Sequence, residues 1–457
     1  MKLPLWRIAE FVGAKGECDQ EAIAMGYSID SRTLNAGDLF IAIAGDRFDG
    51  HEYVETALAK GAVGAVVKTG KKVSGDSARL LHVEDTLKAL QSLGAAARRL
   101  WGKPLLAVTG SAGKTTTKEI LAHILATRFR VMKSSGNLNN HIGMPLQLLK
   151  LEAEHDLAVV EMGMNHAGEI RELGKLAQHD LAVVTTVAPV HLEFFGSLKE
   201  IARAKYEIIE TLHSGGVAVL NADDEYVSQF GRGFKGKVVT FGIRRAADVT
   251  ARNVKVNGAE GSTFDLVVGS VTAPVTFPLV GEHNIYNALA AAAAALERGI
   301  PPSVAAEALS SIQPPDKRGQ ILDIGGATII NDCYNSNPRA LDAMIDTLAS
   351  MKASRRILVA GEMLELGPTA EALHRECGKH AAEKKIDFVI GVRGLARAVA
   401  EGACGAGAQA QFVETPEQAG EWLVRNLHPG DAVLLKASRG VKLERALEML
   451  EKAVFSN

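Results

Sequence analysis

Short apolar runs alternate along this chain with longer stretches of helical periodicity. Continuous apolar runs of strand length lie at Leu105–Thr109, Leu157–Glu161 and Leu181–Val187. Runs without polar alternation are typical of parallel strands that are buried on both faces of a sheet. The second and third runs carry a polar residue at or just past their carboxyl ends, where open α/β sheets bind ligands. This stretch is therefore expected to form an α/β domain with a ligand site at one sheet edge.

The pattern differs on either side of this stretch. Residues 1–85 predict a small unit with a strand in Ala36–Ile43, a polar loop at Gly45–His51 and a helix near 52–60, followed by a connecting helix at 86–100. Alternating β-branched residues at 249–280 predict an antiparallel insertion, and the alanine-rich Asn284–Arg298 predicts a helix.

A proline-rich break at Gln313–Lys317 separates a third unit of alternating strands and helices. The expected strands are Ala327–Ile330, Arg356–Ala360, Asp387–Ile390 and Ala432–Leu435, and the expected helices lie near 338–350, 370–384, 416–426 and 441–453. The prediction is an α/β fold of three domains, 1–85, 86–312 and 313–457, which agrees with the length of 457 residues. The central domain would hold a mostly parallel sheet of the phosphate-loop type, and the last would be a smaller Rossmann-like unit.

Composition narrows the class of protein. An apolar fraction of 47% and a charged fraction of 23% are ordinary for a soluble globular chain, and a net charge of −2 argues against nucleic acid as a partner. The four cysteines are far apart and are expected to be reduced thiols. No apolar run reaches the roughly 18 residues of a membrane span, and the first residues lack the apolar core of a signal peptide. We expect a soluble cytoplasmic protein.

The first apolar run leads into a glycine-rich turn, Gly110-Ser-Ala-Gly-Lys114-Thr115, and then into a helical stretch. Such a turn directs backbone N–H groups and the positive helix end at an anion, with the lysine reaching the β/γ-phosphates and the threonine hydroxyl on Mg²⁺. The spacing departs from the usual G-x-x-x-x-G-K-[ST], because Val occupies position 108. The bare motif also fits an ordinary strand-to-helix turn, but its context favours a nucleotide site.

Taken together and in order, the motifs resemble those of the ATP-dependent Mur ligases of peptidoglycan precursor synthesis, over essentially the whole chain. The matching stretches are 28–32, 110–116, 136–145, 161–168, 191–197, 204–207, 281–284, 317–320, 331–338, 361–367 and 436–439. That family has the same shortened phosphate loop. Within the family the motifs are closest to the ligases that add D-alanyl-D-alanine to UDP-N-acetylmuramoyl-tripeptide, and the 361–367 stretch fits these members.

The resemblance implies ATP, two Mg²⁺ ions and a carbamylated lysine as cofactors. One ion would sit between Thr115 and the phosphates, and the other would be held by Glu161, His191 and carbamylated Lys205. A lysine ammonium cannot ligate a metal, and with a reference pKa near 10.4 only about one side chain in a thousand is neutral at pH 7.4. Capture of CO₂ by the neutral amine would supply an anionic oxygen donor. Taken alone, His191 resembles a core or loop histidine, Glu161 a capping acid and Lys205 a solvated charge.

The resemblance also assigns the ligand-binding residues. Lys114, Glu161, His191 and Lys205 would be catalytic, and ATP would be bound by Gly110, Ser111, Ala112, Gly113, Lys114, Thr115, Thr116, Asn139, Asn140, Asn284, Asn287, Arg318 and Asp332. Asn284 would hydrogen-bond adenine, Asn287 lies one turn along the same helix face, and Asp332 would contact the ribose. The UDP-sugar would lie on Ser31, Asp46, Arg47 and Phe48, and the dipeptide or acyl-phosphate on Asn335, Ser336, Asn337, Lys436 and Arg439.

The implied reaction is amide-bond formation through an acyl-phosphate, with small-molecule substrates, no nucleic acid or membrane partner, and a monomeric enzyme. The nearest alternative is the preceding ligase of the pathway, whose diaminopimelate-adding form carries a late D-N-P-R signature. Here the N-P-R at Asn337–Arg339 comes too early and follows a serine. Folylpolyglutamate synthetase lacks the Ser28–His51 unit, and an inactive ATP-binding scaffold would not need the intact catalytic set. The identity of the tripeptide's third residue, lysine or diaminopimelate, stays open.

Overall fold

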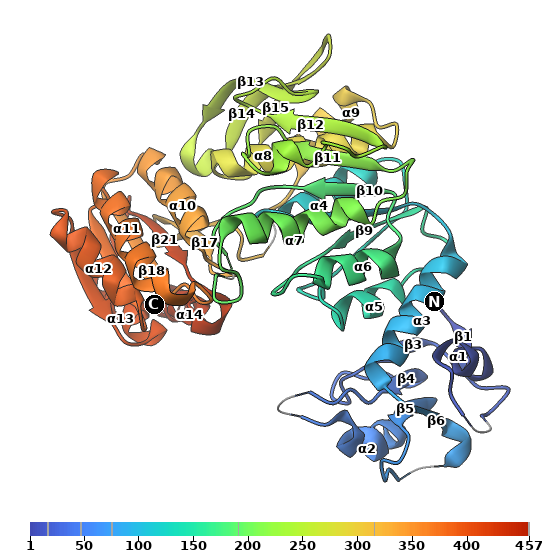
Figure 1. The fold of residues 1–457 in the computed structure, drawn as a ribbon. Helices are drawn as coiled ribbons and strands as arrows, with labels where there is room; N and C mark the ends of the chain where they lie inside the picture. Colours follow the sequence, from blue (N-terminus) through green and yellow to red (C-terminus); the bar gives the residue numbers. More distant parts are fainter. Residues whose placement is uncertain (16–17, 46–47, 75, 191, 315, 456–457) are drawn as a thin grey trace.

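The computed structural model describes residues 1–15, 18–45, 48–74, 76–190, 192–314 and 316–455. Figure 1 shows three α/β units, an N-terminal one in blue, a central one in cyan to yellow and a C-terminal one in orange and red. The central unit lies between the other two, as the three-domain α/β prediction requires. No helix in these ranges is long and apolar enough to cross a lipid bilayer.

The N-terminal unit is built on a small parallel sheet. Its strands follow the order β3 (Gly26–Ser28), β4 (Asp38–Ile41), β5 (Gly64–Lys68) and β6 (Leu80–Val83). A short antiparallel pair, β1 (Leu3–Pro4) and β2 (Ile23–Ala24), stands beside it with α1 (Leu5–Val12), and the predicted helix near 52–60 is η1 (Gly50–Tyr53) continued by α2 (Val54–Ala59).

The connecting helix α3 (Thr86–Trp101) joins the first unit to the second. Asp85 caps its first turn by accepting from the N–H groups of Leu87 and Lys88, and Gly102 ends it in a left-handed conformation at φ 66°. The helix contacts α1 on one side and α5 (Gly143–Leu148) and α6 (Glu169–Ala177) on the other. This long helix therefore packs against both units.

The central unit contains a nine-stranded sheet. The order is β15 (Val271–Phe277), β14 (Ser262–Val268), β13 (Val249–Val256), β12 (Lys237–Gly242), β11 (Val217–Asn221), β10 (Leu181–Val184), β7 (Leu105–Thr109), β9 (Leu157–Glu161) and β8 (Val131–Lys133). Pairing is parallel except within β13–β14–β15. The antiparallel 249–280 segment is confirmed, but it extends the central sheet because β13 pairs in parallel with β12.

Helices cover both faces of this sheet, which explains the continuous apolar runs. Leu106 and Val108 pack toward α4 (Lys114–Leu125), α8 (Glu282–Leu296) and α9 (Pro302–Ser311). Leu105 and Ala107 face the opposite layer, formed by α5, α6 and α7 (Leu198–Glu210). Successive side chains of β7 thus belong to two separate cores, so the side chains on both faces of the strand must be apolar.

The C-terminal unit has a six-stranded sheet, parallel except at one edge. Its order is β16 (Gln320–Ile324), β17 (Ala327–Asp332), β21 (Ala432–Lys436), β18 (Arg356–Gly361), β19 (Phe388–Val392) and β20 (Gln409–Val413). The helices are α10 (Pro338–Ser350), α11 (Ala370–Glu383), α12 (Ala396–Gly405), α13 (Pro416–Asn426) and α14 (Glu444–Phe455).

Four predicted strands and four predicted helices are found in this unit, whereas β16, β20 and α12 are additions. Apolar side chains of the central unit reach its core: Val280, just before α8, is buried among residues of α10 such as Leu341 and Met344, and Ala259 packs against the same cluster. The central and C-terminal units therefore share an apolar contact beside the linker between them.

Candidate active site

A cavity of about 960 Å³ lies between the central and C-terminal units. Its floor is formed by the carboxyl ends of β7, β9, β10 and β11 and the segments that follow them. Its other wall comes from residues that follow β17 and β21 and from α10. We call it the central cavity. Carboxyl ends of parallel strands from two sheets thus converge on one space, the usual place for ligands in α/β folds.

The phosphate loop (Gly110–Gly113) joins β7 to α4 at the cavity floor. Gly113, at φ 81°, is the N-cap of α4, where a glycine is needed because a Cβ would collide with the side chain of Asn287. The N-terminus of α4 is consequently open toward the cavity, an arrangement that suits an anion. Lys114 Nζ donates to the Gly110 carbonyl at 2.9 Å, and burial lowers the pKa of this ammonium while Glu161 opposes the shift.

Two polar side chains from different elements donate to the carboxylate of Glu161, the last residue of β9. Thr115 Oγ1 donates to Glu161 Oε2 at 2.6 Å, and Asn139 Nδ2 donates to Glu161 Oε1 at 2.7 Å. The Glu161 side chain is almost buried, with 4% of the residue exposed. The carboxylate and hydroxyl oxygens form a compact oxygen-rich group directly beside the phosphate loop, the donor type that Mg²⁺ prefers.

Lys205 is buried on α7 at the wall of the same cavity, with 2% of the residue exposed. Burial, together with the charge of Lys114, lowers the pKa of Lys205 well below its usual value. Among the described residues we find no carboxylate paired with its ammonium and no group of three His, Cys, Asp or Glu side chains arranged to hold a metal. His191, the other predicted ligand, lies outside the described residues.

Glu207, one half-turn beyond Lys205, fixes the position of α7. Its carboxylate accepts from the N–H of Gly168 at 2.8 Å and from the N–H of Arg171 at 3.0 Å, at the N-terminus of α6. The residue is 3% exposed. Negative charge is favourable at a helix N-terminus, so this contact ties α7 to α6 and thereby sets where Lys205 enters the cavity.

The two predicted asparagines connect α8 to the phosphate-loop helix. Asn287 Oδ1 accepts from Thr117 Oγ1 at 3.2 Å, and Asn287 Nδ2 donates to Asn284 Oδ1 at 2.9 Å. Asn284 Nδ2 donates to the Val280 carbonyl at 2.8 Å. Both asparagines line the central cavity and each retains hydrogen-bonding capacity beyond these contacts.

A tyrosine–aspartate pair beside the asparagines was not predicted. Tyr286 donates its hydroxyl to Asp223 Oδ2 at 2.9 Å, and Asp223 also accepts backbone N–H groups of Ile243, Arg244 and Arg245. This pair holds the turn after β12 against α8 at the cavity wall. The available signal was the Asp223-Asp224 pair just past an apolar run, at the carboxyl end of β11.

The C-terminal wall contributes a nearly buried ion pair. Register places Asp332 of β17 opposite Lys436 of β21, and Lys436 Nζ lies 2.5 Å from Asp332 Oδ2 and 3.0 Å from the Asn335 carbonyl. The predicted ribose residue and a predicted dipeptide residue are therefore partners of each other. Beside them, the Ser336 hydroxyl is buried and finds no hydrogen-bond partner among the residues described, and Asn337 caps α10.

Tyr334, also not predicted, lies between two predicted arginines. The Arg318 guanidinium carbon is 3.8 Å from the centre of its ring and that of Arg439 is 5.3 Å away. Arg439 Nη1 additionally contacts the tyrosine hydroxyl at 3.4 Å. A ring that attracts both cations places them at the same edge of the cavity although each comes from a different strand connection.

Most other predicted ATP and dipeptide residues line the central cavity, with two exceptions. Asn140 Oδ1 accepts from the N–H of Gly143, the first residue of α5, at 2.8 Å, and Gly110, the first residue of the phosphate loop, lies against Thr185. In the N-terminal unit, Ser31 is buried with its carbonyl bonded to Lys60, and Phe48 is largely exposed. Asp46 and Arg47 lie outside the described residues. The described wall of the central cavity contains no residue of the N-terminal unit.

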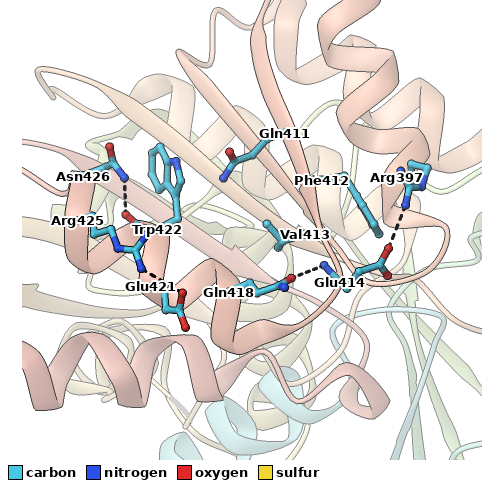
Figure 2. A pocket seen from close by; sticks show the side chains of 10 residues that line it. All are labelled: Arg397, Gln411, Phe412, Val413, Glu414, Gln418, Glu421, Trp422, Arg425 and Asn426. Atoms are coloured by element: carbon cyan, nitrogen blue, oxygen red, sulfur yellow. Dashed lines mark hydrogen bonds and ion pairs between the residues drawn. The ribbon is translucent and has the colours of Figure 1, made fainter.

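A second hollow lies at the far edge of the C-terminal sheet, between β20 and α13 (Figure 2). Arg397 stacks on Phe412 at 3.9 Å and pairs with Glu414 at 3.1 Å, while Trp422 stacks on Phe388 at 4.6 Å. The predicted site residues do not line it. We call it the β20 groove. It provides a comparison for substitutions at the central cavity.

Comparison with known proteins agrees with this geometry. Residues 25–100, 108–295 and 317–439 match three family domains, described as "Mur ligase family, catalytic domain", "Mur ligase middle domain" and "Mur ligase, glutamate ligase domain". A UDP-N-acetylmuramoyl-tripeptide–D-alanyl-D-alanine ligase of Bacillus subtilis is 35% identical over 96% of this chain and 95% of its own length.

Two solved structures have the same fold throughout. A crystal structure of MurF from Acinetobacter baumannii aligns with a TM-score of 0.90 and 30% identity, covering 99% of both chains. The MurF ligase from Thermotoga maritima, solved in complex with ADP, aligns with a TM-score of 0.84 and 28% identity over 95% of this chain and 98% of that one.

Proposed function

The chain belongs to the Mur ligase family, and we propose that it is an ATP-dependent amide ligase that joins D-alanyl-D-alanine to UDP-N-acetylmuramoyl-tripeptide. The product would be the pentapeptide precursor of peptidoglycan. The observation that carries the proposal is similarity over nearly the full length of both chains to relatives that bear this activity in their names. Partial similarity confined to the nucleotide-binding unit would have supported ATP use alone.

ATP would lie across the central cavity. The open N-terminus of α4 and Lys114 suit the β- and γ-phosphates, and Arg318 would reach the phosphates from the opposite wall. Adenine would lie near Asn284, and the ribose near Asp332. Because Lys436 already occupies one oxygen of Asp332, the ribose hydroxyls would use the other. The ADP complex of the Thermotoga maritima relative supports a nucleotide in this family fold.

Magnesium fits the residues present. Thr115 Oγ1 and Glu161 Oε2 are oxygen atoms beside the phosphate loop: Thr115 would hold one Mg²⁺ together with the nucleotide phosphates, and Glu161 would hold the other. Lys205 would join Glu161 at the second ion after carbamylation, for which its lowered pKa and lack of a described carboxylate partner are favourable. His191 is the remaining proposed ligand. When bound, the two ions would screen the negative charges of the phosphoryl group and the substrate carboxylate.

The reaction has two steps in which this chain's side chains mainly position and stabilise the reactants. The terminal carboxylate of the tripeptide attacks the γ-phosphorus, and ADP leaves with the electrons of the broken P–O bond. The dipeptide amine then attacks the acyl carbon, loses a proton, and phosphate departs. Lys114 and the N–H groups of the phosphate loop would stabilise charge on the transferred group. Docking of the C-terminal unit would exclude water, which would otherwise hydrolyse the acyl-phosphate.

The other reactants would be held by the outer units, with 1–85, 86–312 and 313–457 as the proposed domains. Ser31, Asp46, Arg47 and Phe48 would bind the UDP-sugar, whose peptide would extend to the central cavity. Asn335, Ser336, Asn337, Lys436 and Arg439 would hold the dipeptide or the acyl-phosphate. The unpartnered Ser336 hydroxyl on the cavity wall supports this assignment, because a buried hydroxyl requires a partner. We further propose that the enzyme works as a monomer in the cytoplasm.

The test is phosphate release by the purified protein with ATP, Mg²⁺ and UDP-N-acetylmuramoyl-tripeptide. Three acceptors are compared: D-alanyl-D-alanine, lysine and diaminopimelate. We expect release that requires both the tripeptide and D-alanyl-D-alanine, with a product heavier by the dipeptide. If release instead requires the sugar nucleotide that carries only a dipeptide, together with a diamino acid as acceptor, the protein catalyses the preceding step of the pathway. No release with any precursor would overturn the ligase proposal.

A further inference from the structure

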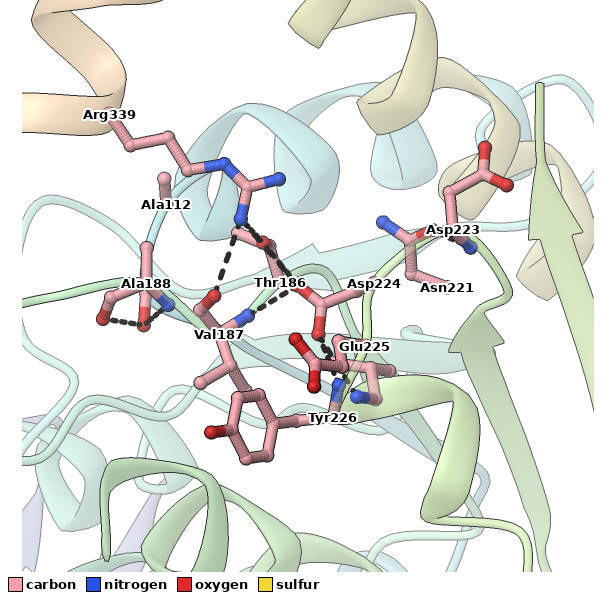
Figure 3. Close-up of polar contacts among 12 residues, drawn as sticks. Ala112, Thr186, Val187, Ala188, Asn221, Asp223, Asp224, Glu225, Tyr226 and Arg339 are labelled. Atoms are coloured by element: carbon pink, nitrogen blue, oxygen red, sulfur yellow. Dashed lines mark hydrogen bonds and ion pairs between the residues drawn. The ribbon is translucent and has the colours of Figure 1, made fainter. Parts of the chain in front are cut away.

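A nearly buried carboxylate organises the segment that follows β10. Asp224, which follows β11, has a side chain that is 3% exposed. Its Oδ2 accepts from Thr186 Oγ1 at 2.7 Å and from the Val187 N–H at 2.9 Å, while its Oδ1 accepts the N–H groups of Tyr226 and Val227. These bonds, drawn in Figure 3, fix what we call the post-β10 segment (Thr185–Ala188).

The same segment is hydrogen-bonded to the phosphate loop. The Ser111 N–H donates to the Thr186 carbonyl at 2.8 Å, and the Ala188 N–H donates to Ser111 Oγ at 2.9 Å. Thr185 Oγ1 donates to the Ala112 carbonyl at 2.6 Å. Two consecutive residues of the loop therefore take their positions from the post-β10 segment. A displacement of this segment would therefore move Ser111 and Ala112, which line the central cavity.

Arg339 brings the C-terminal unit to this segment. It is the second residue of α10, and its Nη1 donates to Thr186 Oγ1 at 2.9 Å and to the Val187 carbonyl at 3.3 Å. The same nitrogen lies 3.6 Å from Asp224 Oδ2. The Thr186 hydroxyl thus accepts from a cation and donates to an anion, and bonds that involve charged groups are stronger than neutral ones. Figure 3 shows the guanidinium reaching over this segment toward Asp224.

We infer that Arg339 is a positioning residue that couples docking of the C-terminal unit to the phosphate loop through Thr186. The path consists of two hydrogen bonds on Thr186: Arg339 Nη1 donates to its hydroxyl, and the Ser111 N–H donates to its backbone carbonyl. The inference rests on the proposed ATP-dependent function, because it concerns how the nucleotide site is completed. Coupling of this kind is reciprocal, so nucleotide binding should favour the docked arrangement as much as docking favours nucleotide binding.

The test compares three variants by two measurements that require no turnover. Arg339→Gln removes the cation, Thr186→Val removes the shared hydroxyl while leaving Arg339, and the double variant removes both. The control is Arg397→Gln in the β20 groove, because Arg397 has a side-chain exposure of 56% against 57% for Arg339 and also pairs with a carboxylate. The measurements are the affinity for ADP with Mg²⁺ by titration calorimetry and the radius of gyration by X-ray scattering, with and without ADP.

We expect Arg339→Gln and Thr186→Val each to weaken ADP binding by roughly tenfold, the range of ordinary coupling between sites. The double variant should be no weaker than the worse single variant, because both changes break one path. The radius of gyration should rise in all three, and ADP should compact them less than it compacts wild type. Arg397→Gln should change neither quantity.

Three results would overturn the inference. Multiplicative losses in the double variant would mean that Arg339 acts on the nucleotide independently of Thr186. An ADP affinity within twofold of wild type would mean that docking is not coupled to the loop, as would an equal loss in Arg397→Gln. Failure of the proposed function can be told apart from failure of this inference. If the wild-type protein binds ADP but forms no product, the proposed reaction is contradicted. The ADP affinities of the variants then still decide whether Arg339 couples docking to the phosphate loop.

Discussion

Lys436 and Asp332 face each other on neighbouring parallel strands and form a nearly buried ion pair, with side chains 4% and 14% exposed. The pair stands at the C-terminal wall of the central cavity, so its loss has structural as well as functional effects. Removing one member of a buried pair leaves an uncompensated charge, which costs more than the pair itself contributes.

Asp332→Ala should therefore destabilise the protein in addition to raising the Michaelis constant for ATP. We expect a loss of about 3 kcal/mol in the free energy of unfolding of the C-terminal unit, because the Lys436 ammonium stays buried without its carboxylate. Thermal and urea unfolding measure it. The matched control is Lys317→Ala, which breaks the more exposed pair with Glu444 and should cost less than about 1 kcal/mol. Equal losses in the two variants would contradict the buried-pair explanation, and an unchanged Michaelis constant would remove Asp332 from the ribose site.

Lys205→Ala should abolish ligation yet leave ADP binding within about twofold of wild type. The proposed carbamate is lost, whereas the phosphate loop and Lys114 remain. Lys199→Ala, an exposed lysine on the same helix, should behave as wild type. Calorimetry with ADP and a product assay separate the two effects, and labelling with ¹³C-bicarbonate should give a carbamate NMR signal in wild type and in Lys199→Ala but not in Lys205→Ala. Normal turnover of the Lys205 variant would rule the carbamate out.

Tyr334→Leu should raise the Michaelis constant for ATP by roughly three- to tenfold, because cation–π contacts contribute about 0.5–2 kcal/mol and the ring positions Arg318 and Arg439. Tyr334→Phe, which keeps the ring, should stay within about twofold of wild type. Phe412→Leu removes an equivalent ring, under Arg397 in the β20 groove, and should leave the Michaelis constant for ATP unchanged. Steady-state kinetics at saturating concentrations of the other two substrates measure these Michaelis constants. If Tyr334→Phe and Tyr334→Leu raise the Michaelis constant for ATP equally, the hydroxyl rather than the ring is responsible.

His179 should make the protein less stable in acid. Burial lowers its pKa from 6.5 to about 4, and its Nε2 donates to the Ile208 carbonyl at 2.9 Å. Between pH 6.5 and 4 the unfolded chain binds a proton that the folded chain does not, so stability falls as the pH falls through this window. The contribution reaches about 3 kcal/mol at most. Urea unfolding of His179→Leu should show a shallower pH dependence than wild type.

The apolar pattern predicted the central unit well because each buried strand had to satisfy two cores. Leu105 and Leu106 point to opposite helix layers, so no polar position interrupts the run. The edge strand β20 was missed for the opposite reason: Gln409 and Gln411 are tolerated where one side of the strand faces solvent. The Ala- and Gly-rich α12 likewise lacks the large apolar side chains that make helical periodicity visible.

The site residues likewise divide into those that the local sequence pattern indicates and those that depend on long-range packing. Glu161 ends β9, and Lys114 and Thr115 come just after the turn that follows β7, so their convergence at the carboxyl edge of the sheet could be inferred from the pattern of parallel strands. Tyr334 and Arg339 could not be inferred in this way. Their roles depend on how two separately folded sheets are docked, and no local pattern encodes which loops of the two units meet. The Asp332–Lys436 pair required the register of β17 with β21, which chain order does not give.

The buried Val280 and the polar Arg339 cross the same boundary by different physics. An apolar side chain in a core is held by the area it removes from water, which does not depend on direction, whereas hydrogen bonds weaken steeply when their angles change. A small swing of the C-terminal unit can therefore keep Val280 covered while it releases Arg339. The boundary thus combines an apolar contact that tolerates small movements of the C-terminal unit with a polar contact that does not.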